Sequence, residues 1–307
     1  MRRALASLLV LGLAMHGAAP AQQAPDRDYR PPIAKPRYAE GKGPVVCVDE
    51  AHHNFHTLGE RFFAFGELLR RDGFRLRPLA QTFAAASLAP CDVLVISNAQ
   101  PDDGRWDDYP YPTPSAFTPE EVEAVQRWVR DGGSLLLIAD HMPLAGAAAG
   151  LAAAFQVEFV DGFARREPAT HEPDLFTREH DTLRDHAITR GDGEPVTPVT
   201  AVRTFTGQAF RAPDVEPLLV FPAGYVQLLP EKAWRFAPDT RRVAVEGWLQ
   251  GAVKRVGKGR AAFFGEAAMF SAQLAGPDQE PMGMNSPGAE QNHQLVLNLL
   301  HWLTGTL

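Results

Sequence analysis

The sequence is poor in cysteine and in clustered positive charge. Its 307 residues include only Cys47 and Cys91, which leaves at most one disulfide, and no run of more than two basic residues occurs. The net charge of −7 and the pI of about 5.8 argue against nucleic acid and anionic membranes as partners. Apolar residues make up 45% and charged residues 22%, which is typical of a globular protein with a sizeable core.

Long hydrophobic runs are also missing, except for a short one at the N-terminus. Arg2 and Arg3 precede the apolar stretch 4–15, and Ala19-Pro20-Ala21 follows it as an A-x-A-like cleavage site. The stretch is shorter than the roughly 20 apolar residues that span a bilayer. We therefore predict a signal peptide over 1–21 and a periplasmic or secreted mature protein without stable membrane insertion; an uncleaved anchor is the alternative.

The two cysteines are predicted to remain free. Cys47 lies in the middle of the predicted strand VVCVD, whereas Cys91 opens the predicted strand CDVLVIS. If these strands are parallel with aligned carboxyl ends, the two residues are about four positions out of step. At about 3.3 Å per residue, that offset exceeds the roughly 7 Å over which a disulfide can form. We expect two buried thiols, neither of them a nucleophile.

The hydrophobic pattern alternates between strands and helices after a Pro-rich linker at 22–43. Continuous apolar runs predict buried strands, and apolar residues at helical spacing predict the helices between them. Residues 171–230 instead carry short strand-like pieces, which indicates an inserted antiparallel extension. The pattern predicts one domain over 44–307, with a doubly wound, flavodoxin-like, mainly parallel sheet. The expected strands are 44–49, 74–79, 91–97, 134–139, 157–160 and 260–265, and the expected helices are 58–71, 118–130, 145–155 and 292–303.

Polar residues follow four of the predicted strands. Asp49, Asn98, Asp140 and Glu266 each lie at or just after a strand end. In an open parallel sheet, ligands bind beyond the carboxyl ends of the strands, near the point where strand order reverses. We expect these residues to share one rim and to form a ligand site there.

A divalent metal such as Zn²⁺ or Mn²⁺ is one candidate occupant of that rim. Its ligands would be Asp49, His52 or His53, Asp140 or His141, and Glu266, because mixed nitrogen and oxygen donors suit such ions. No H-E-x-x-H motif supports this interpretation. The alternative for the histidines at 52, 53 and 56 is a solvated loop that caps the following helix.

Catalytic roles fall to Asp140, His141 and Glu266. No G-x-S-x-G occurs and neither cysteine lies at a strand–helix turn, which disfavours serine and cysteine hydrolase triads. Asp140 could attack as a nucleophile with His141 or His52 as base, or could form an acid–base pair with Glu266 if burial separates their pKa values. An Asp that only accepts backbone hydrogen bonds in a tight turn is the alternative.

Four other residues are candidates for substrate binding. Asn54 and Asn98 would orient the substrate, Trp106 lies in an aromatic loop suited to stacking on a sugar ring, and Gln208 follows a strand-like piece. The aromatic residues of that loop could equally pack it against the domain.

Taken together, several stretches resemble the class I glutamine amidotransferase-like superfamily. They resemble in particular an exported branch related to ThuA-like and gliding-motility/intraflagellar-transport (GIFT-type) domains. The stretches are VVCVDEAHHNFH, CDVLVISNAQ, GGSLLLIADHMP, RDHAITRG and GEAAMFSAQ with NHQLVLNLLHWL. The resemblance implies a flavodoxin-like three-layer sandwich. It also shows that the amidotransferase cysteine is replaced by Asp140-His141 and the His-x-Glu partner by Gly265-Glu266-Ala267, so glutamine hydrolysis through a thioester is excluded.

Two functions from different classes follow from these patterns. The first is a metal- or carboxylate-dependent, hydrolase-like enzyme that acts on a small polar ligand, with a carbohydrate as one candidate. The second is a non-catalytic sugar- or cell-wall-binding module of the periplasm. A scaffold that binds a partner in an envelope complex is a weaker third hypothesis.

Overall fold

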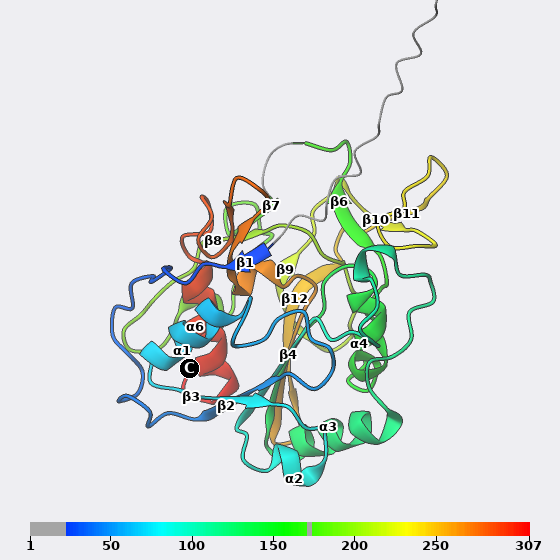
Figure 1. Cartoon of the computed structure of the whole chain (residues 1–307). Coiled ribbons are helices and arrows are strands. Elements are labelled where there is room, and N and C mark those ends of the chain that lie inside the picture. Colours follow the sequence, from blue (N-terminus) through cyan, green and yellow to red (C-terminus); the bar gives the residue numbers. More distant parts are fainter. Residues whose placement is uncertain (1–22, 171–173) are drawn as a thin grey trace, which may run out of the picture.

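A seven-stranded, mostly parallel sheet forms the centre of the molecule (Figure 1). The computed structural model describes residues 23–170 and 174–307; the predicted signal peptide lies outside them. The first five strands are parallel to one another, and the last two pairings of the sheet are antiparallel, so that only the sixth strand runs in the opposite direction. In the order of the sheet, the strands are β3 (Arg75–Leu79), β2 (Val45–Asp49), β4 (Val93–Ser97), β5 (Ser134–Ile138), β13 (Gly259–Phe264), β12 (Leu249–Val256) and β9 (Glu216–Val220).

Helices cover both faces of this sheet, which confirms the flavodoxin-like, doubly wound class. Figure 1 shows α1 (Phe63–Arg71) and α6 (Asn292–Leu303) on one side and α3 (Pro119–Asp131) and α4 (Leu144–Ala153) on the other. Alternate residues of one strand enter separate cores, because successive side chains point to opposite faces. Val46 and Val48 join the core beneath α1 and α6, whereas Cys47 joins the core beneath α2 (Ala85–Leu88), α3 and α4.

Local sequence signals explain most of the element boundaries. Thr118 caps α3: its Oγ1 accepts a hydrogen bond from the Glu121 N–H, and Glu121 accepts one from the Thr118 N–H. The helix predicted from residue 58 begins only at Phe63, because Leu58 N–H is bonded to Glu50 Oε1 and a turn occupies the intervening residues. The strand predicted at 157–160 is reduced to a single bridge between Glu158 and Arg211.

The predicted antiparallel extension is present, although it is divided among several sheets. Strand β9 extends the central sheet, while a separate sheet has the order β11-β10-β6. The remaining elements of this region are β6 (Phe163–Arg166), β7 (Asp174–Thr177), α5 (Ala187–Arg190), β8 (Ala201–Thr204), β10 (Tyr225–Leu229) and β11 (Arg241–Ala244). Strands β7 and β8 form an antiparallel pair of their own.

The segment 23–43, which the sequence predicts as a flexible linker, is packed against the domain. Strand β1 (Gln23–Pro25) pairs with β14 (Ala272–Ala275), which in turn pairs with β15 (Glu280–Gly283). Farther along, the Tyr38 ring packs edge-on against Phe74, with centroids 5.1 Å apart. Backbone pairing and aromatic packing therefore hold a segment whose sequence has no periodicity.

The prediction of two free thiols is wrong, because Cys47 and Cys91 form a disulfide with their Cα atoms 5.7 Å apart. The prediction assumed that Cys91 continues strand β4, but β4 begins only at Val93. Cys91 lies instead in the turn after α2, where its N–H donates to Leu88 O. This turn brings Cys91 over the strand that contains Cys47, so the strand offset does not set their separation.

No helix among residues 23–170 and 174–307 combines the length and the apolar character that crossing a bilayer requires. The remaining helical segments are single turns, η1 (Trp106–Asp108) and η2 (Ala268–Phe270).

Candidate functional site

A cavity of about 330 Å³ lies where loops from several strand ends meet. Strands β2, β4, β5 and β13 are parallel neighbours, so the loops that follow them start at the same edge of the sheet. The volume of this cavity is in the range of small-molecule sites. The lining residues include four predicted site residues, Asn98, Trp106, Asp140 and His141, together with Gln23, Phe55, His56, Leu144, Phe205, Thr206, Trp234, Ala268, Gln273 and Met282.

Asn98 and Asp140 connect two of these loops. Asn98 follows β4 with a positive φ of 49°, a conformation that Asn tolerates better than most residues. Its Oδ1 accepts a hydrogen bond of 2.9 Å from the Asp140 N–H, and Asp140 Oδ1 accepts one of 2.9 Å from the His141 N–H. These bonds hold the Asp140 carboxyl at the cavity wall, where the residue is 7% exposed.

The hydrogen bonds of His141 determine its tautomer. Nδ1 lies 2.8 Å from Met142 O, and because a carbonyl can only accept, Nδ1 carries the proton. In the neutral ring Nε2 is therefore the acceptor. The imidazole stacks on Phe163 at 4.6 Å between centroids and meets Trp234 edge-on at 4.7 Å. His141 thus brings an oriented base to the cavity.

Glu266 is a fully buried carboxyl behind this wall. Its two oxygens accept hydrogen bonds from the N–H groups of Ala268 and Met269, at 2.8 and 2.9 Å. Burial, and after it the nearby charge of Asp140, raises the pKa of Glu266 well above its ordinary value, in spite of the two backbone bonds. The charge of Asp140 therefore acts on Glu266, although Glu266 itself does not line the cavity.

His56 is a cavity residue that sequence reasoning assigned only to a histidine-rich loop. It is 2% exposed, its ring lies 4.6 Å from that of Phe62, and its Nδ1 is 3.2 Å from Ser97 Oγ. Burial, and then the charge of Arg61, lowers the pKa of His56 to about 3. The imidazole is therefore neutral near pH 7. In the sequence, the one indication that His56 lies near the site was its position seven residues after the end of strand β2.

Asp49, His52 and Asn54 are brought together, but they bond to one another and are absent from the cavity lining. Asp49 Oδ1 lies 2.9 Å from His52 Nδ1, and Asp49 Oδ2 accepts from Asn54 Nδ2 at 2.9 Å. His52 Nε2 lies 2.9 Å from Glu121 Oε1, so both ring nitrogens have carboxylate partners. Burial lowers the pKa of His52, but the bonds and charges of Asp49 and Glu121 outweigh it and raise that pKa.

The three predicted metal ligands do not fit a metal ion. Both nitrogens of His52 are used, while His53 is 44% exposed and pairs with Asp103 at 2.5 Å, away from the buried Asp49. In the part of the chain that the structure describes, no group of three or more His, Cys, Asp or Glu residues is arranged to hold a metal. His52 instead links the β2 loop to helix α3, which contains Glu121.

Gln208 also differs from its predicted role. Its Nε2 donates to Ala139 O at 2.9 Å and its Oε1 accepts from the Val160 N–H at 2.7 Å. The side chain is fully buried and does not line the cavity. Gln208 joins three chain segments, so it supports the site without contacting a ligand in it.

Aromatic residues form part of the cavity lining, as predicted for Trp106. Its ring meets Phe55 at 5.5 Å and Trp234 at 6.3 Å. Trp234, in the loop after β10, is 39% exposed and was not identified from the sequence. Trp234 belongs to no periodic hydrophobic pattern in the sequence. Only the fold brings it to Trp106 and His141, which lie more than 90 positions earlier in the chain.

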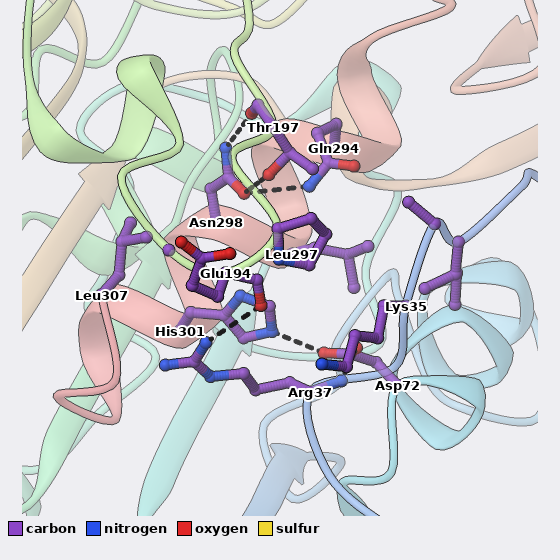
Figure 2. A pocket seen from close by; sticks show the side chains of 14 residues that line it. Lys35, Arg37, Asp72, Glu194, Thr197, Gln294, Leu297, Asn298, His301 and Leu307 are labelled. Carbon is purple, nitrogen blue, oxygen red and sulfur yellow. Dashed lines mark hydrogen bonds and ion pairs between the residues drawn. The ribbon is translucent and has the colours of Figure 1, made fainter.

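A second cavity, shown in Figure 2, lies between the N-terminal segment, α6 and residues 193–197. It offers only about 20 Å³, which is room for roughly one water molecule. Its polar side chains bond to one another: His301 Nε2 lies 2.6 Å from Asp72 Oδ2, and Gln294 donates to Asn298 at 2.9 Å. These hydrogen bonds link the segments around the cavity, and the cavity is too small for a ligand.

Comparison with known proteins supports the fold and does not extend to function. No protein-family model and no curated protein matches the chain. Among solved structures, the mmIFT52 N-terminal domain is similar with a TM-score of 0.59 at 14% identity, covering 84% of this chain and 97% of that one. A cytoplasmic protein from Salmonella typhimurium LT2 has a TM-score of 0.50 at 16% identity, covering 84% and 98%.

A putative ThuA-like protein from Bacteroides uniformis is also among the similar structures, with a TM-score of 0.46 at 14% identity, covering 87% of this chain and 93% of that one. At these identities the similarities show the fold alone.

Proposed function

We propose that the 330 Å³ cavity is the active site of an exported, carboxylate-dependent, hydrolase-like enzyme that acts on a small polar ligand, with a carbohydrate as one candidate. The observation that carries this proposal is the pairing of Asp140 at the cavity wall with the buried Glu266, whose pKa is raised by burial and by the charge of Asp140. Carboxyl pairs with divided pKa values are a recurrent device of acid–base catalysis.

In this mechanism Asp140 and His141 touch the ligand, and Glu266 acts through Asp140. His141 Nε2, which is unprotonated in the neutral ring, accepts a proton from a water or hydroxyl bound in the cavity. Asp140 forms a bond to the reacting centre as the bond to the leaving group breaks. The oxygen deprotonated by His141 then displaces Asp140 from that centre, and His141 gives its proton to the leaving group. Glu266 does not line the cavity, and its raised pKa favours the neutral acid, which places less negative charge near Asp140.

The competing proposal is a non-catalytic module that binds a sugar or a cell-wall fragment. The aromatic residues Phe55, Trp106 and Trp234 in the cavity lining support it, because aromatic faces stack on sugar rings. This module would tolerate Asp140→Asn but would lose its ligand when Trp106 is replaced by alanine.

Export is part of the proposal, as is membership of the exported ThuA-like branch. The Cys47–Cys91 disulfide supports export, since structural disulfides persist mainly in oxidising compartments. N-terminal sequencing of protein recovered from a periplasmic fraction should start near residue 22. A chain that retains Met1, or that stays reduced in the cytoplasm, contradicts export.

The test of function compares Asp140→Asn with Asp239→Asn on a panel of nitrophenyl glycosides and esters. Asp239 is exposed and is absent from the cavity lining, so it controls for the loss of one negative charge. We expect Asp140→Asn to lower kcat by about 100-fold or more, the usual size of an acid–base contribution, and the control to keep wild-type rates. Equal rates for both variants would refute the catalytic proposal, whereas binding without turnover would favour the module.

A further inference from the structure

Gln273 on strand β14 has an unpartnered hydrogen-bond acceptor in the lining of the cavity. The residue is 1% exposed, and its Nε2 donates to Ser271 Oγ at 2.7 Å. Ser271 Oγ donates its single proton to Ala268 O at 3.0 Å and therefore acts as the acceptor for Gln273 Nε2. Gln273 Oε1 is therefore an acceptor without a donor among the described residues.

Other buried glutamines of this fold show what a purely structural amide looks like. Gln208 uses both ends of its amide, and so does Gln227, whose Oε1 accepts from the Ala209 N–H and whose Nε2 donates to Val160 O, each at 2.8 Å. Gln250 also has an unpartnered oxygen, but its side chain does not line the cavity. An unmade bond to a buried polar atom is costly, and Gln273 has this unmade bond in a residue that belongs to the cavity lining.

The wall that holds Gln273 is the three-stranded sheet β1-β14-β15. Cross-strand pairing places Pro25, Gln273 and Met282 in one row, so their side chains share a face of this sheet. Gln273 and Met282 line the cavity, as does Gln23 from the N-terminal strand, whose Nε2 lies 4.0 Å from Met282 Sδ. The N-terminal segment of the chain thus completes the wall around Gln273.

We propose that Gln273 is a ligand-binding residue that selects ligands carrying a hydroxyl or amide N–H, by accepting that hydrogen bond at Oε1. This inference deepens the proposed function, because it rests on the same cavity. The donor is uncharged, since an amide oxygen cannot offset the cost of burying a cation at this wall. The aromatic residues in the lining, among them Trp106 and Trp234, favour a ring elsewhere in the ligand.

The experiment measures binding of three probes to the mature protein by calorimetry. Methyl α-glucopyranoside offers hydroxyl donors, benzamide offers an amide N–H, and acetophenone has the shape of benzamide without a donor. We expect wild-type protein to bind at least one donor probe and to discriminate against acetophenone. The donor probe that binds identifies the source of the donor.

Three variants then test the residue. Gln273→Leu should weaken the donor probe by about tenfold, the loss typical of one buried hydrogen bond. Gln273→Met keeps the length of the side chain without an acceptor and should weaken the donor probe as Gln273→Leu does. Without probe, Gln273→Leu should melt no lower than wild type, because it removes an unpartnered acceptor, whereas Gln208→Leu should melt lower. A structural role for Gln273 would reverse that order.

The outcomes separate this inference from the proposed function. It is overturned if neither donor probe binds wild-type protein, or if Gln273→Leu binds as tightly as wild type. If Gln273→Leu loses the probe while Asp140→Asn retains full turnover, the binding residue stands and the catalytic proposal fails. If Asp140→Asn loses turnover and Gln273→Leu binds normally, the reverse holds.

Discussion

Removing the Cys47–Cys91 disulfide should destabilise the protein strongly. The bond joins residues 44 positions apart, across a segment that contains α1, β3 and α2. Cys47 is fully buried and Cys91 is 7% exposed, so the bond lies inside one of the two cores. Reduction leaves both side chains in place and removes only the constraint, which makes the reduced wild-type protein the cleanest comparison.

The magnitude follows from the length of the closed loop. A cross-link over 44 positions lowers the entropy of the unfolded chain by about 13 cal/mol/K, which corresponds to ~4 kcal/mol at room temperature. Domains are stable by only about 5–15 kcal/mol, so this is a large share of the total. Replacing both cysteines with alanine should lower the free energy of unfolding by at least as much, because it also removes buried sulfur atoms.

Urea unfolding of the oxidised, reduced and doubly substituted proteins, followed by circular dichroism, measures these differences. We expect the oxidised protein to unfold at the highest urea concentration and the other two at lower, similar concentrations. A difference below about 1 kcal/mol between oxidised and reduced protein would refute the loop-entropy argument. It would mean that the unfolded chain keeps these segments together without the bond.

Three further predictions concern the histidines and the N-terminal strand. Because the pKa of His56 is lowered to about 3, the unfolded chain binds a proton below pH 6.5 that the folded protein does not bind. The free energy of unfolding should therefore fall by about 1.4 kcal/mol per pH unit as the pH decreases below 6.5. Urea unfolding of His56→Gln at several pH values should lack this slope. The pKa of His52 is raised, so its contribution to stability is complete below pH 6.5 and is lost as the pH rises through the pKa of the folded state. The difference in free energy of unfolding between wild type and His52→Gln should therefore shrink from pH 6 upward. A constant difference would contradict the ion pairs of His52 with Asp49 and Glu121. A chain that starts at Asp26 lacks β1, so acrylamide should quench its tryptophans more than those of the full mature chain; equal quenching would show that Gln23 does not close the cavity.

Much of the fold could be predicted from local patterns. The closing helix 292–303 and the buried strand from Ser134 have the predicted limits to within one residue, because apolar periodicity and flanking glycines mark their ends. The prediction is worse where contacts with distant residues decide the structure. Strand β1 has no pattern of its own and forms because β14, about 250 residues later, offers a free edge.

The candidate site was also predicted only in part, because contacts between distant residues decide which side chains face the cavity. Parallel topology brings Asn98 and Asp140 to one cavity, as expected from residues that follow strand ends, and the aromatic loop adds Trp106 to its lining. Sequence position did not show which side chains face inward, and Asp49 and His52 satisfy each other instead. Gln273 and Trp234 were missed because neither follows a predicted strand end, and Gln273, although it ends the stretch GEAAMFSAQ, was given no role there.

The sequence by itself determined the doubly wound sheet and the edge at which its polar loops meet, because hydrophobic periodicity and the rules of parallel topology act over short stretches of chain. Only the tertiary structure decided which polar groups pair, which cysteines bond and which groups face an open cavity. These outcomes depend on distances between side chains that are remote in the sequence. Asp49 is paired with His52, whereas Asp140 lies at the cavity wall, although both lie at or just after the ends of parallel strands of one sheet.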